Sequence, residues 1–376
     1  MRVVILLDRL FARREREMLS RLEISLADEG VRVIHAVPFM SLGQEPIGLY
    51  STVVGYNDRG LSLTRRSRAA QLRDAIARAV EDEDHHDVDV VHALGVPAWR
   101  MGMDLAGMLG ACVLLELWQG GALPTAASLA SHKVGARAPE FAVCEPAMRR
   151  ALRKRAAHAT VHLVPWGVHT PPTVPPPSPP EQPLSVAMLA DTGDPTAVTA
   201  ALTGIARLAE RPRGVLVFAG TQDGASGRDS AIWSAARKLG LLDRLSLVAD
   251  MEARREPILQ MDMLVLPEAT GRQRTLVLDA MAHGVNVVAA ADELSESLVD
   301  GSTARLVTSS TADAWTDALR DVAESTEASQ RRRETAQDFV RSQRTASGHG
   351  GAVMTAYNAM VAAAKVGVPD LARQLS

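Results

Sequence analysis

The stretch LPEATGRQRTLVLDAMAHG, residues 266–284, holds residue types that suit an anionic ligand. An apolar run ends in a short loop that carries Arg272 and Arg274, and a helical pattern follows at once. The first turn of a helix presents unpaired backbone N–H groups, and arginines supply forked donors, so both favour phosphate. The only carboxylate inside the expected helix is Asp279. The stretch therefore predicts a phosphate-binding loop with an unusual set of charges.

The elements that must position this loop follow a regular alternation. Short apolar runs such as VVILL, VRVIHAVP, VDVVHALG and ACVLLEL are each followed by a longer segment with helical spacing. Continuous apolar strands that alternate with helices are typical of a parallel sheet covered on both faces. We therefore expect an α/β protein with doubly wound sheets, in which ligands bind beyond the carboxyl ends of the strands.

The alternation stops once and then restarts. Residues 171–183, PPTVPPPSPPEQP, contain eight prolines in thirteen positions, which predicts an extended, semi-rigid linker. We expect one Rossmann-like domain over residues 1–170 and another over 184–345. A final periodic segment, 350–367, predicts a terminal helix that packs back on the first domain.

Composition narrows the classes of function. The net charge of −3 gives no general attraction to nucleic acid, and 3% aromatic residues disfavour a base-stacking surface. Cys112 and Cys144 lie in apolar runs, which predicts buried thiols in a reducing cytoplasm. The first residues predict a buried strand rather than a signal peptide, and no run approaches a membrane span. The acidic run at 81–87 predicts a solvated loop in preference to a metal site.

Several longer segments resemble one family, the retaining glycosyltransferases of the GT-B architecture known as family four or group one. The segments are CEPAMRRAL with VPWGVHTP, QMDMLVLPEATGRQRTLVLDAMAHGVNVVAA, and ESLVDGSTARLV. Strand, proline, helix, AMAHG and VDG follow in the family's order and spacing. The resemblance implies two Rossmann-like domains, an acceptor-side domain first and a nucleotide-sugar donor domain second.

The resemblance also implies a reaction. Members of the family transfer a sugar from a nucleotide-sugar donor to an acceptor without a metal ion or other cofactor. The diphosphate that leaves is held by helix N-terminal amides and basic side chains, and paired carboxylates hold hydroxyls of the sugar and the ribose. For this chain the implied partners are a nucleotide sugar and a glycan or other acceptor. Nucleic acid is not implied, and membrane contact would be peripheral at most.

The donor loop departs from the family's pattern. The paired glutamates fall at Gly271 and Asp279, so the first carboxylate is missing and the second is shorter by one methylene. Arginines at 272 and 274 replace the family's glycines. With Thr275 at the start of the helix, these residues form the predicted donor-binding set. Glu268 precedes the loop at a different spacing and is a catalytic candidate, as is His92 at the end of another strand.

Other signature positions are altered as well. The family's arginine and lysine after the first strand of the donor domain have no counterpart in 186–198, where Asp191 and Asp194 stand instead. Counting back from the helix-ending glycine places the family's Gly-Gly pair at Arg13 and Arg14. Trp118 replaces a histidine of the acceptor side. Arg13, Arg14 and Trp118 are therefore the acceptor-side candidates.

Each candidate also has a purely structural interpretation. Arg272 and Arg274 also suit a solvated loop, and Asp279 suits a polar position of a helix. The arginines at 13 and 14 also suit a charged helix face, and the basic helix around 149–155 suits a solvated face or anionic lipid headgroups. His92 suits a packed, hydrogen-bonded histidine, and Trp118 suits the core.

Two functions remain open on the sequence. One is a transferase with an atypical donor site, in which arginines replace the missing cations. The other is a catalytically inactive GT-B homologue that serves as a partner subunit or binding protein. A sugar epimerase or phosphorylase is less favoured by the AMAHG and VDG layout. A dehydrogenase is disfavoured because no G-x-G-x-x-G follows the first strand.

Overall fold

The chain folds into two compact units in the computed structural model. Unit 1 comprises Met1–Trp166 together with the segment that begins at Ala346, and unit 2 comprises Gly167–Thr345. The structure describes residues 1–42, 51–80, 87–135, 137–173, 176, 178–179, 181–191, 194–221 and 231–366. Most of the acidic run at 81–87 lies outside these ranges.

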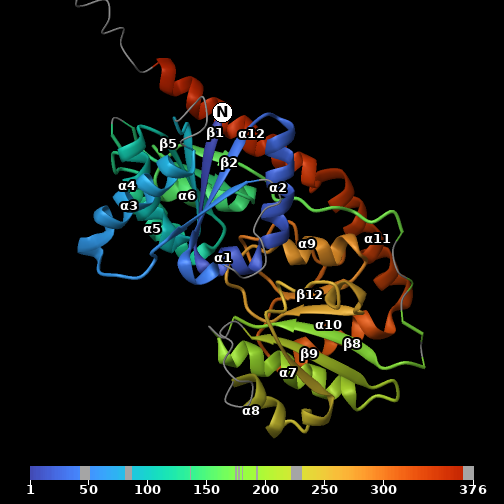
Figure 1. Ribbon diagram of the computed structural model, residues 1–376. Coiled ribbons are helices and arrows are strands. Elements are labelled where there is room, and N and C mark those ends of the chain that lie inside the picture. The colour runs from blue at the N-terminus through green and yellow to red at the C-terminus, as the bar shows by residue number, and fades with distance from the viewer. Residues whose placement is uncertain are drawn as a thin grey trace, which may run out of the picture. The chain divides into compact units, whose positions relative to one another are not determined.

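Unit 1 is built on a parallel sheet of seven strands in the order β3-β2-β1-β4-β5-β6-β7. Strands β1, β2 and β5 of this sheet are labelled in Figure 1. The order reverses between β1 and β4, where Val3 lies opposite Val90 and Leu7 opposite Leu94. The strands are β1 (Arg2–Leu7), β2 (Arg32–Pro38), β3 (Thr52–Tyr56), β4 (Val90–Leu94), β5 (Cys112–Leu117), β6 (Glu140–Val143) and β7 (Val161–Leu163). Every residue of β1, β4 and β5 is buried, which is why these runs are continuously apolar rather than alternating.

The helices of unit 1 lie between its strands in the sequence and cover the sheet. They are α1 (Arg9–Arg14), α2 (Arg16–Asp28), α3 (Arg65–Ala79), α4 (Val96–Leu109), α5 (Leu123–Leu129) and α6 (Pro146–Arg155). Helix α4 ends at Gly110 in the left-handed conformation, with φ of 68°, which a glycine adopts without steric cost. Both cysteines are free and buried in this unit, as their apolar surroundings predicted.

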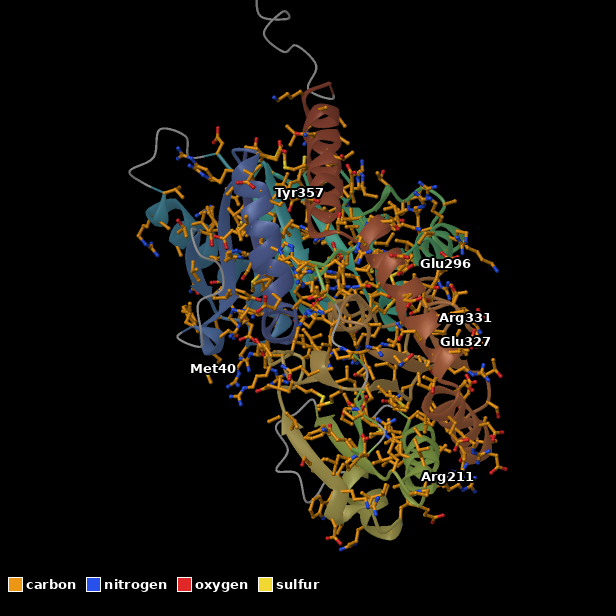
Figure 2. The ribbon with its side chains drawn as sticks, turned by 90° about the vertical axis from the view of Figure 1, so that its right-hand side faces the viewer. Met40, Arg211, Glu296, Glu327, Arg331 and Tyr357 are labelled. Atoms are coloured by element: carbon orange, nitrogen blue, oxygen red, sulfur yellow. The ribbon has the colours of Figure 1, made fainter. Side chains whose placement is uncertain are left out.

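The last helix, α12 (Ala346–Val366), returns to unit 1 and packs along α2. Figure 2 shows Tyr357 on this helix. Its hydroxyl hydrogen-bonds with Nδ1 of His92 on β4 at 2.8 Å, and both residues are buried. A hydrogen bond in the core therefore joins the end of the chain to the centre of the first sheet.

Unit 2 is built on a parallel sheet of six strands in the order β10-β9-β8-β11-β12-β13. The strands are β8 (Leu184–Leu189), β9 (Val215–Thr221), β10 (Leu245–Ala249), β11 (Met263–Leu266), β12 (Asn286–Ala290) and β13 (Arg305–Val307). The helices are α7 (Pro195–Ala209), α8 (Ala231–Lys238), α9 (Thr275–Ala282), α10 (Ala312–Glu324) and α11 (Thr326–Gln343). The order reverses between β8 and β11, so the ends of these two strands form the switch point of unit 2.

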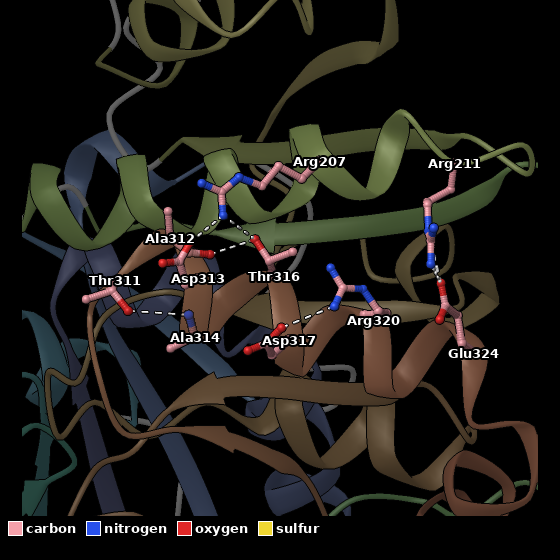
Figure 3. A network of polar contacts seen from close by, with 10 residues as sticks. All are labelled: Arg207, Arg211, Thr311, Ala312, Asp313, Ala314, Thr316, Asp317, Arg320 and Glu324. Atoms are coloured by element: carbon pink, nitrogen blue, oxygen red, sulfur yellow. Dashed lines mark hydrogen bonds and ion pairs between the residues drawn. The ribbon is translucent and has the colours of Figure 1, made fainter.

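Helices α7 and α10 pack side by side in unit 2, and polar contacts join them (Figure 3). Arg207 Nη1 lies 2.6 Å from Asp313 Oδ1, and Arg211 pairs with Glu324 at 2.5 Å. The close approach requires a glycine, because a Cβ added to Gly204 would lie 2.9 Å from Cβ of Trp315. Exposed ion pairs contribute little to stability. The packing of the two helices is therefore stabilised mainly by the apolar contacts on their buried sides.

The proline-rich segment belongs to unit 2 rather than forming a separate linker. Ser178 N–H donates to Asp262 Oδ1 at 3.3 Å. The Arg213 guanidinium donates to the carbonyls of Ser178, Pro179 and Gln182. Three residues of the segment predicted to be an extended, semi-rigid linker are thus hydrogen-bonded to the rest of unit 2, namely Ser178, Pro179 and Gln182.

Among the described residues, no helix combines the length and apolarity needed to cross a membrane.

Candidate functional site

The predicted donor loop lies at the switch point of unit 2. Asp191 and Asp194 follow β8, Glu268 follows β11, and the loop 267–274 leads into α9. Carboxyl ends of adjacent parallel strands meet at one edge of the sheet, which is where ligands of such folds bind. Topology alone therefore brings the altered positions of both segments together.

Arg274 of the loop pairs with two carboxylates. One guanidinium nitrogen bonds to Asp191 Oδ1 and the other to Glu252 Oε1, and the side chain is 6% exposed. Burial by itself lowers the pKa of Arg274, but Glu252 and Asp191 outweigh it and raise that pKa above the ordinary value. The guanidinium group of Arg274 therefore stays protonated. Its two terminal nitrogens each contact a carboxylate.

Arg272 shares the same carboxylate. Its Nη1 lies 2.7 Å from Asp191 Oδ1, and its side chain is 19% exposed. Between β11 and Arg272, Gly271 adopts φ of 61° and donates its N–H to Asp292 Oδ2 at 2.5 Å. The position that carries the family's first glutamate is thus a left-handed turn closed by an aspartate, which suits glycine.

Asp279 is buried on α9, 4% exposed, and pairs with a residue outside the predicted set. Arg255 Nη1 lies 2.5 Å from Asp279 Oδ2 and 2.8 Å from the hydroxyl of Thr275. His283 donates its backbone N–H to the carbonyl of Asp279 at 3.0 Å. Both Asp279 and Thr275, expected to contact the donor, are therefore engaged by Arg255.

Glu268 fixes the loop that follows β8. Its carboxylate accepts the backbone N–H of Asp191 and that of Asp194, the latter at 2.8 Å. Asp194 in turn caps α7 by accepting the N–H groups of Thr196 and Ala197. The carboxylate of this catalytic candidate is thus engaged by two main-chain amides of the neighbouring loop.

Three carboxylates of the site pair with its guanidinium groups, while those of Glu268 and Asp292 accept main-chain N–H groups. The guanidinium groups of Arg255, Arg272 and Arg274 face the carboxylates of Asp191, Glu252 and Asp279. Arg255 and Glu252 were missed from the sequence. The signal was the charged run DMEARRE directly after β10, since the ends of parallel strands collect at one edge. At this switch point, Arg255, Arg272 and Arg274 each have a carboxylate partner.

In unit 1 the corresponding switch point holds Asp8, which the sequence analysis also missed. Asp8 follows β1, caps α1 by accepting the N–H of Phe11 at 2.7 Å, and lies against Gly95, where any Cβ would collide with its carboxylate. Burial raises the pKa of Asp8 from 3.8 to about 6, against the lowering effect of the Phe11 and Leu10 amides and of Arg14. A perturbed carboxyl at a switch point is a candidate for function.

The acceptor-side arginines lie in the last turn of α1. Arg14 is buried, as is the adjacent Glu15, whereas Arg13 is partly exposed. The interpretation as a charged helix face exposed to solvent is therefore wrong for Arg14. The positive charge of Arg14 acts on Asp8 instead.

His92 and Trp118 both belong to the interior of unit 1. His92 is 1% exposed and contacts Tyr357 Oη and, at 3.0 Å, Glu116 Oε2. The other oxygen of Glu116 accepts the indole N–H of Trp166 at 2.7 Å. Trp118 is 2% exposed and meets Phe11 edge to face at 5.7 Å. Trp118 therefore offers no exposed ring for stacking with an acceptor, and His92 has the packed, hydrogen-bonded environment of a structural histidine.

No group of three or more potential metal ligands occurs within the described ranges.

Comparison with known proteins finds a family model that matches part of the chain. Residues 185–325 match the family model described as "Glycosyl transferases group 1". No curated protein sequence matches the chain significantly. The match covers the switch point of unit 2, with both its loops and α9.

Solved structures match nearly the whole chain. A glycosyltransferase from Rickettsia africae superposes with a TM-score of 0.69 at 12% identity, over 96% of this chain and 98% of that one. Sucrose-phosphate synthase from Thermosynechococcus elongatus gives a TM-score of 0.69 at 14% identity, over 96% and 100%. Anabaena Alr3699/HepE, in complex with UDP and glucose, gives 0.66 at 15% identity, over 96% and 100%. Identities this low establish the fold alone. The chain thus has the GT-B fold, and its residues 185–325 match the group 1 glycosyltransferase model.

Proposed function

We propose that this protein transfers a sugar from a nucleotide-sugar donor to an acceptor, and that the donor diphosphate binds at the switch point of unit 2. The observation that carries the proposal is the convergence of Arg255, Arg272 and Arg274 around the first turn of α9. Guanidinium forks and helix N-terminal amides together are a recurrent way to hold phosphate oxygens. The proposed ligands replace the arginine and lysine that the family carries after β8.

In the proposed reaction, the bond between the anomeric carbon and the diphosphate oxygen breaks. A bond forms between that carbon and an acceptor hydroxyl oxygen, and the hydroxyl proton is released. Negative charge grows on the departing diphosphate, so fixed cations at that position lower the barrier. To reach Arg272 and Arg274, the diphosphate must displace the carboxylate of Asp191.

A similar structure supports a nucleotide-sugar donor. Anabaena Alr3699/HepE has been solved with UDP and with UDP-glucose. The proposal therefore takes uridine diphosphate and its sugar esters as the first ligands to examine.

A second function is favoured by the ion pairs of the same site. Each of the three guanidinium groups already faces a carboxylate, and stripping a partner from a buried ion costs several kcal/mol, roughly 3–5. On this alternative the ion pairs are a permanent core, and the protein is an inactive homologue that works as a partner subunit or binding protein.

Titration calorimetry with the full chain separates the two functions. UDP and UDP-glucose are titrated into the wild type and into Asp191→Asn, with Asp317→Asn on the outer face of α10 as a control of equal charge change. If the diphosphate competes with Asp191, the D191N variant binds UDP about tenfold more tightly, a gain of about 1.4 kcal/mol, and D317N behaves as the wild type. Absence of UDP and UDP-glucose binding by wild type and D191N alike overturns the transferase proposal.

A further inference from the structure

Exposed apolar side chains are concentrated in one part of unit 1. Nine large apolar side chains are exposed among the residues that the structure describes, and six of them lie between Phe39 and Leu63. Single exposed apolar residues are ordinary, whereas a concentration of them marks an interaction surface. The most exposed are Leu61 and Leu63, at 73% and 91%.

Two turns that follow neighbouring strands carry five of these six side chains, namely Phe39, Met40, Leu42, Leu61 and Leu63. One turn is η1 (Phe39–Ser41) after β2, and the other is η2 (Ser62–Thr64) after β3, the edge strand of the sheet. Figure 2 labels Met40, which is 60% exposed. The last residues of the two strands, Pro38 and Tyr56, lie opposite each other. Both turns therefore leave the sheet of unit 1 at the same edge.

The turn that carries the two leucines is held in place by polar contacts. Thr64 donates its backbone N–H, at 3.1 Å, and its hydroxyl, at 2.9 Å, to the carbonyl of Leu61. The guanidinium of Arg68, on α3, donates to the carbonyl of Asn57 at 3.1 Å. An ordered turn loses little conformational freedom when it binds a partner. The leucines are therefore presented to water in a conformation that the protein itself maintains.

The segment around the leucines is strongly basic. Residues 51–80 contain six arginines, no lysine and two aspartates, a net charge of +4 in a chain whose total is −3. Three ion pairs neutralise carboxylates of this region, namely Arg9–Asp58, Arg65–Asp104 and Arg73–Asp74. Arg59 and Arg66 precede and follow the two leucines in the sequence, and both are exposed. The exposed leucines thus stand between exposed cations.

Leucines between arginines match the boundary between the headgroups and the acyl chains of a lipid bilayer. Apolar side chains enter the acyl region there, while arginines keep their aliphatic stems in it and extend their guanidinium groups to the phosphates. The positive charge favours anionic lipid over neutral lipid. Nucleic acid offers phosphates and base faces, so it would leave Leu61 and Leu63 in water.

We propose that the turns after β2 and β3 dock on a membrane surface that contains anionic phospholipid. Leu61 and Leu63 enter the acyl boundary, and Arg59 and Arg66 contact the phosphate groups. The proposal does not rest on the proposed transferase activity, because it uses no residue of unit 2.

The test is co-sedimentation of the full chain with sucrose-loaded vesicles. Vesicles of phosphatidylcholine and phosphatidylglycerol in equal parts provide the anionic surface, and vesicles of phosphatidylcholine alone provide the neutral one. The wild type is expected to bind the mixed vesicles at least about tenfold more tightly, and added salt is expected to weaken that binding. Failure of the wild type to bind the mixed vesicles overturns the proposal.

Variants of the leucines locate the contact. Leu61→Ser combined with Leu63→Ser is expected to weaken binding to the mixed vesicles by about tenfold or more, because these side chains no longer gain from leaving water. Leu216→Ser combined with Val299→Ser removes two exposed apolar side chains of unit 2 and should bind as the wild type does. Thermal denaturation checks that both variants are folded. Binding by L61S/L63S as tight as that of the wild type contradicts the proposal.

Variants of the arginines separate this surface from the basic helix α6. Arg59→Gln combined with Arg66→Gln should weaken binding by about tenfold and make it less sensitive to salt. Arg153→Gln combined with Arg155→Gln removes the same charge from the exposed end of α6 and should change binding by less than about twofold. A loss with R153Q/R155Q that equals or exceeds the loss with R59Q/R66Q places the contact on α6 and overturns the proposal.

A second copy of the chain is the alternative occupant of this surface. Sedimentation velocity without lipid is expected to give the same oligomeric state for the wild type and for L61S/L63S. An oligomer of the wild type that L61S/L63S dissociates assigns the leucines to contact between copies and overturns the lipid proposal.

Discussion

At the scale of single residues, the buried ion pair of Arg255 with Asp279 holds helix α9 to the loop that follows β10. Both side chains are almost fully buried, at 5% and 6% exposure, and the oxygen and nitrogen lie 2.5 Å apart. A buried pair is costly to break because the remaining ion has lost its water. The carboxylate of Asp279 on α9 therefore has a structural role that does not depend on a ligand.

We expect Asp279→Ala to destabilise the protein by about 3–5 kcal/mol, because the buried guanidinium of Arg255 loses the carboxylate that it pairs with. The control is Asp338→Ala, which removes an exposed carboxylate paired with Arg341 and should cost at most about 1 kcal/mol. Urea denaturation of both variants measures the difference. Equal effects would show that the Arg255–Asp279 pair contributes nothing beyond a surface ion pair.

At the scale of elements, one contact between helices is set by a residue without a side chain. Gly204 lets α7 approach α10 so closely that a Cβ would meet Cβ of Trp315 and the backbone of Thr316 at 2.9 and 3.0 Å. Neither neighbour is the flexible end of a side chain.

Gly204→Leu should therefore cost about 1–3 kcal/mol or more, the usual penalty of overpacking. Thr199→Leu places the same side chain at an exposed position of the same helix and should change stability by less than about 0.5 kcal/mol. Thermal denaturation compares the two. If G204L is as stable as T199L, helices α7 and α10 can move apart to accommodate the leucine side chain at little cost in free energy.

The terminal helix is held by a polar contact in the core as well as by apolar packing. Tyr357→Phe removes the hydroxyl that meets His92 Nδ1 and leaves that nitrogen without this partner. We expect a loss of about 1–3 kcal/mol. Thr355→Ala, an exposed position on the same helix whose hydroxyl bonds only to Gly351 O in the described contacts, provides the comparison. Similar unfolding free energies for Y357F and T355A would contradict a structural role for His92.

At the scale of the whole molecule, two buried groups in unit 1 oppose each other in their effect on stability. Burial raises the pKa of Asp8 from 3.8 to about 6. Burial also lowers the pKa of His349 from 6.5 to about 4, although Glu116 acts in the opposite direction. Each change corresponds to about 3 kcal/mol.

The signs follow from which state binds more protons. Between pH 4 and 6 the folded state keeps a proton on Asp8 that the unfolded state loses, so stability falls as pH rises. Between pH 4 and 6.5 the unfolded state holds a proton on His349 that the folded state lacks, so stability rises with pH. The two contributions nearly cancel in the wild type.

Single variants should separate the two contributions. Relative to the wild type, Asp8→Asn is expected to gain up to about 3 kcal/mol as pH rises from 4 to 6, because the penalty of Asp8 is removed. His349→Gln is expected to lose a similar amount over pH 4 to 6.5. Urea denaturation at several pH values gives both difference curves. Curves that are flat across this range would show that neither pKa is displaced in the folded protein.

The sequence pattern by itself determined the α/β class and placed the loop 267–274 at the end of a strand, and the resemblance to a known family implied the GT-B architecture. Strands buried on both faces must be continuously apolar, and the loop after each parallel strand must emerge at one edge, so local pattern carries this information. The resemblance also predicts that Gly271 stands at the position of the family's first glutamate and that arginines replace the loop glycines.

Only the tertiary structure decided what those residues contact. Arg274 meets Asp191 and Glu252, and Asp279 meets Arg255, across long separations in the chain. The proline-rich segment is fastened to unit 2, and His92 bonds to a helix at the opposite end of the sequence. Pairing of this kind depends on side-chain direction and burial after folding. Side-chain direction and burial cannot be read from the spacing of residues along the chain. The ion pairs of the site are therefore visible only in the folded structure.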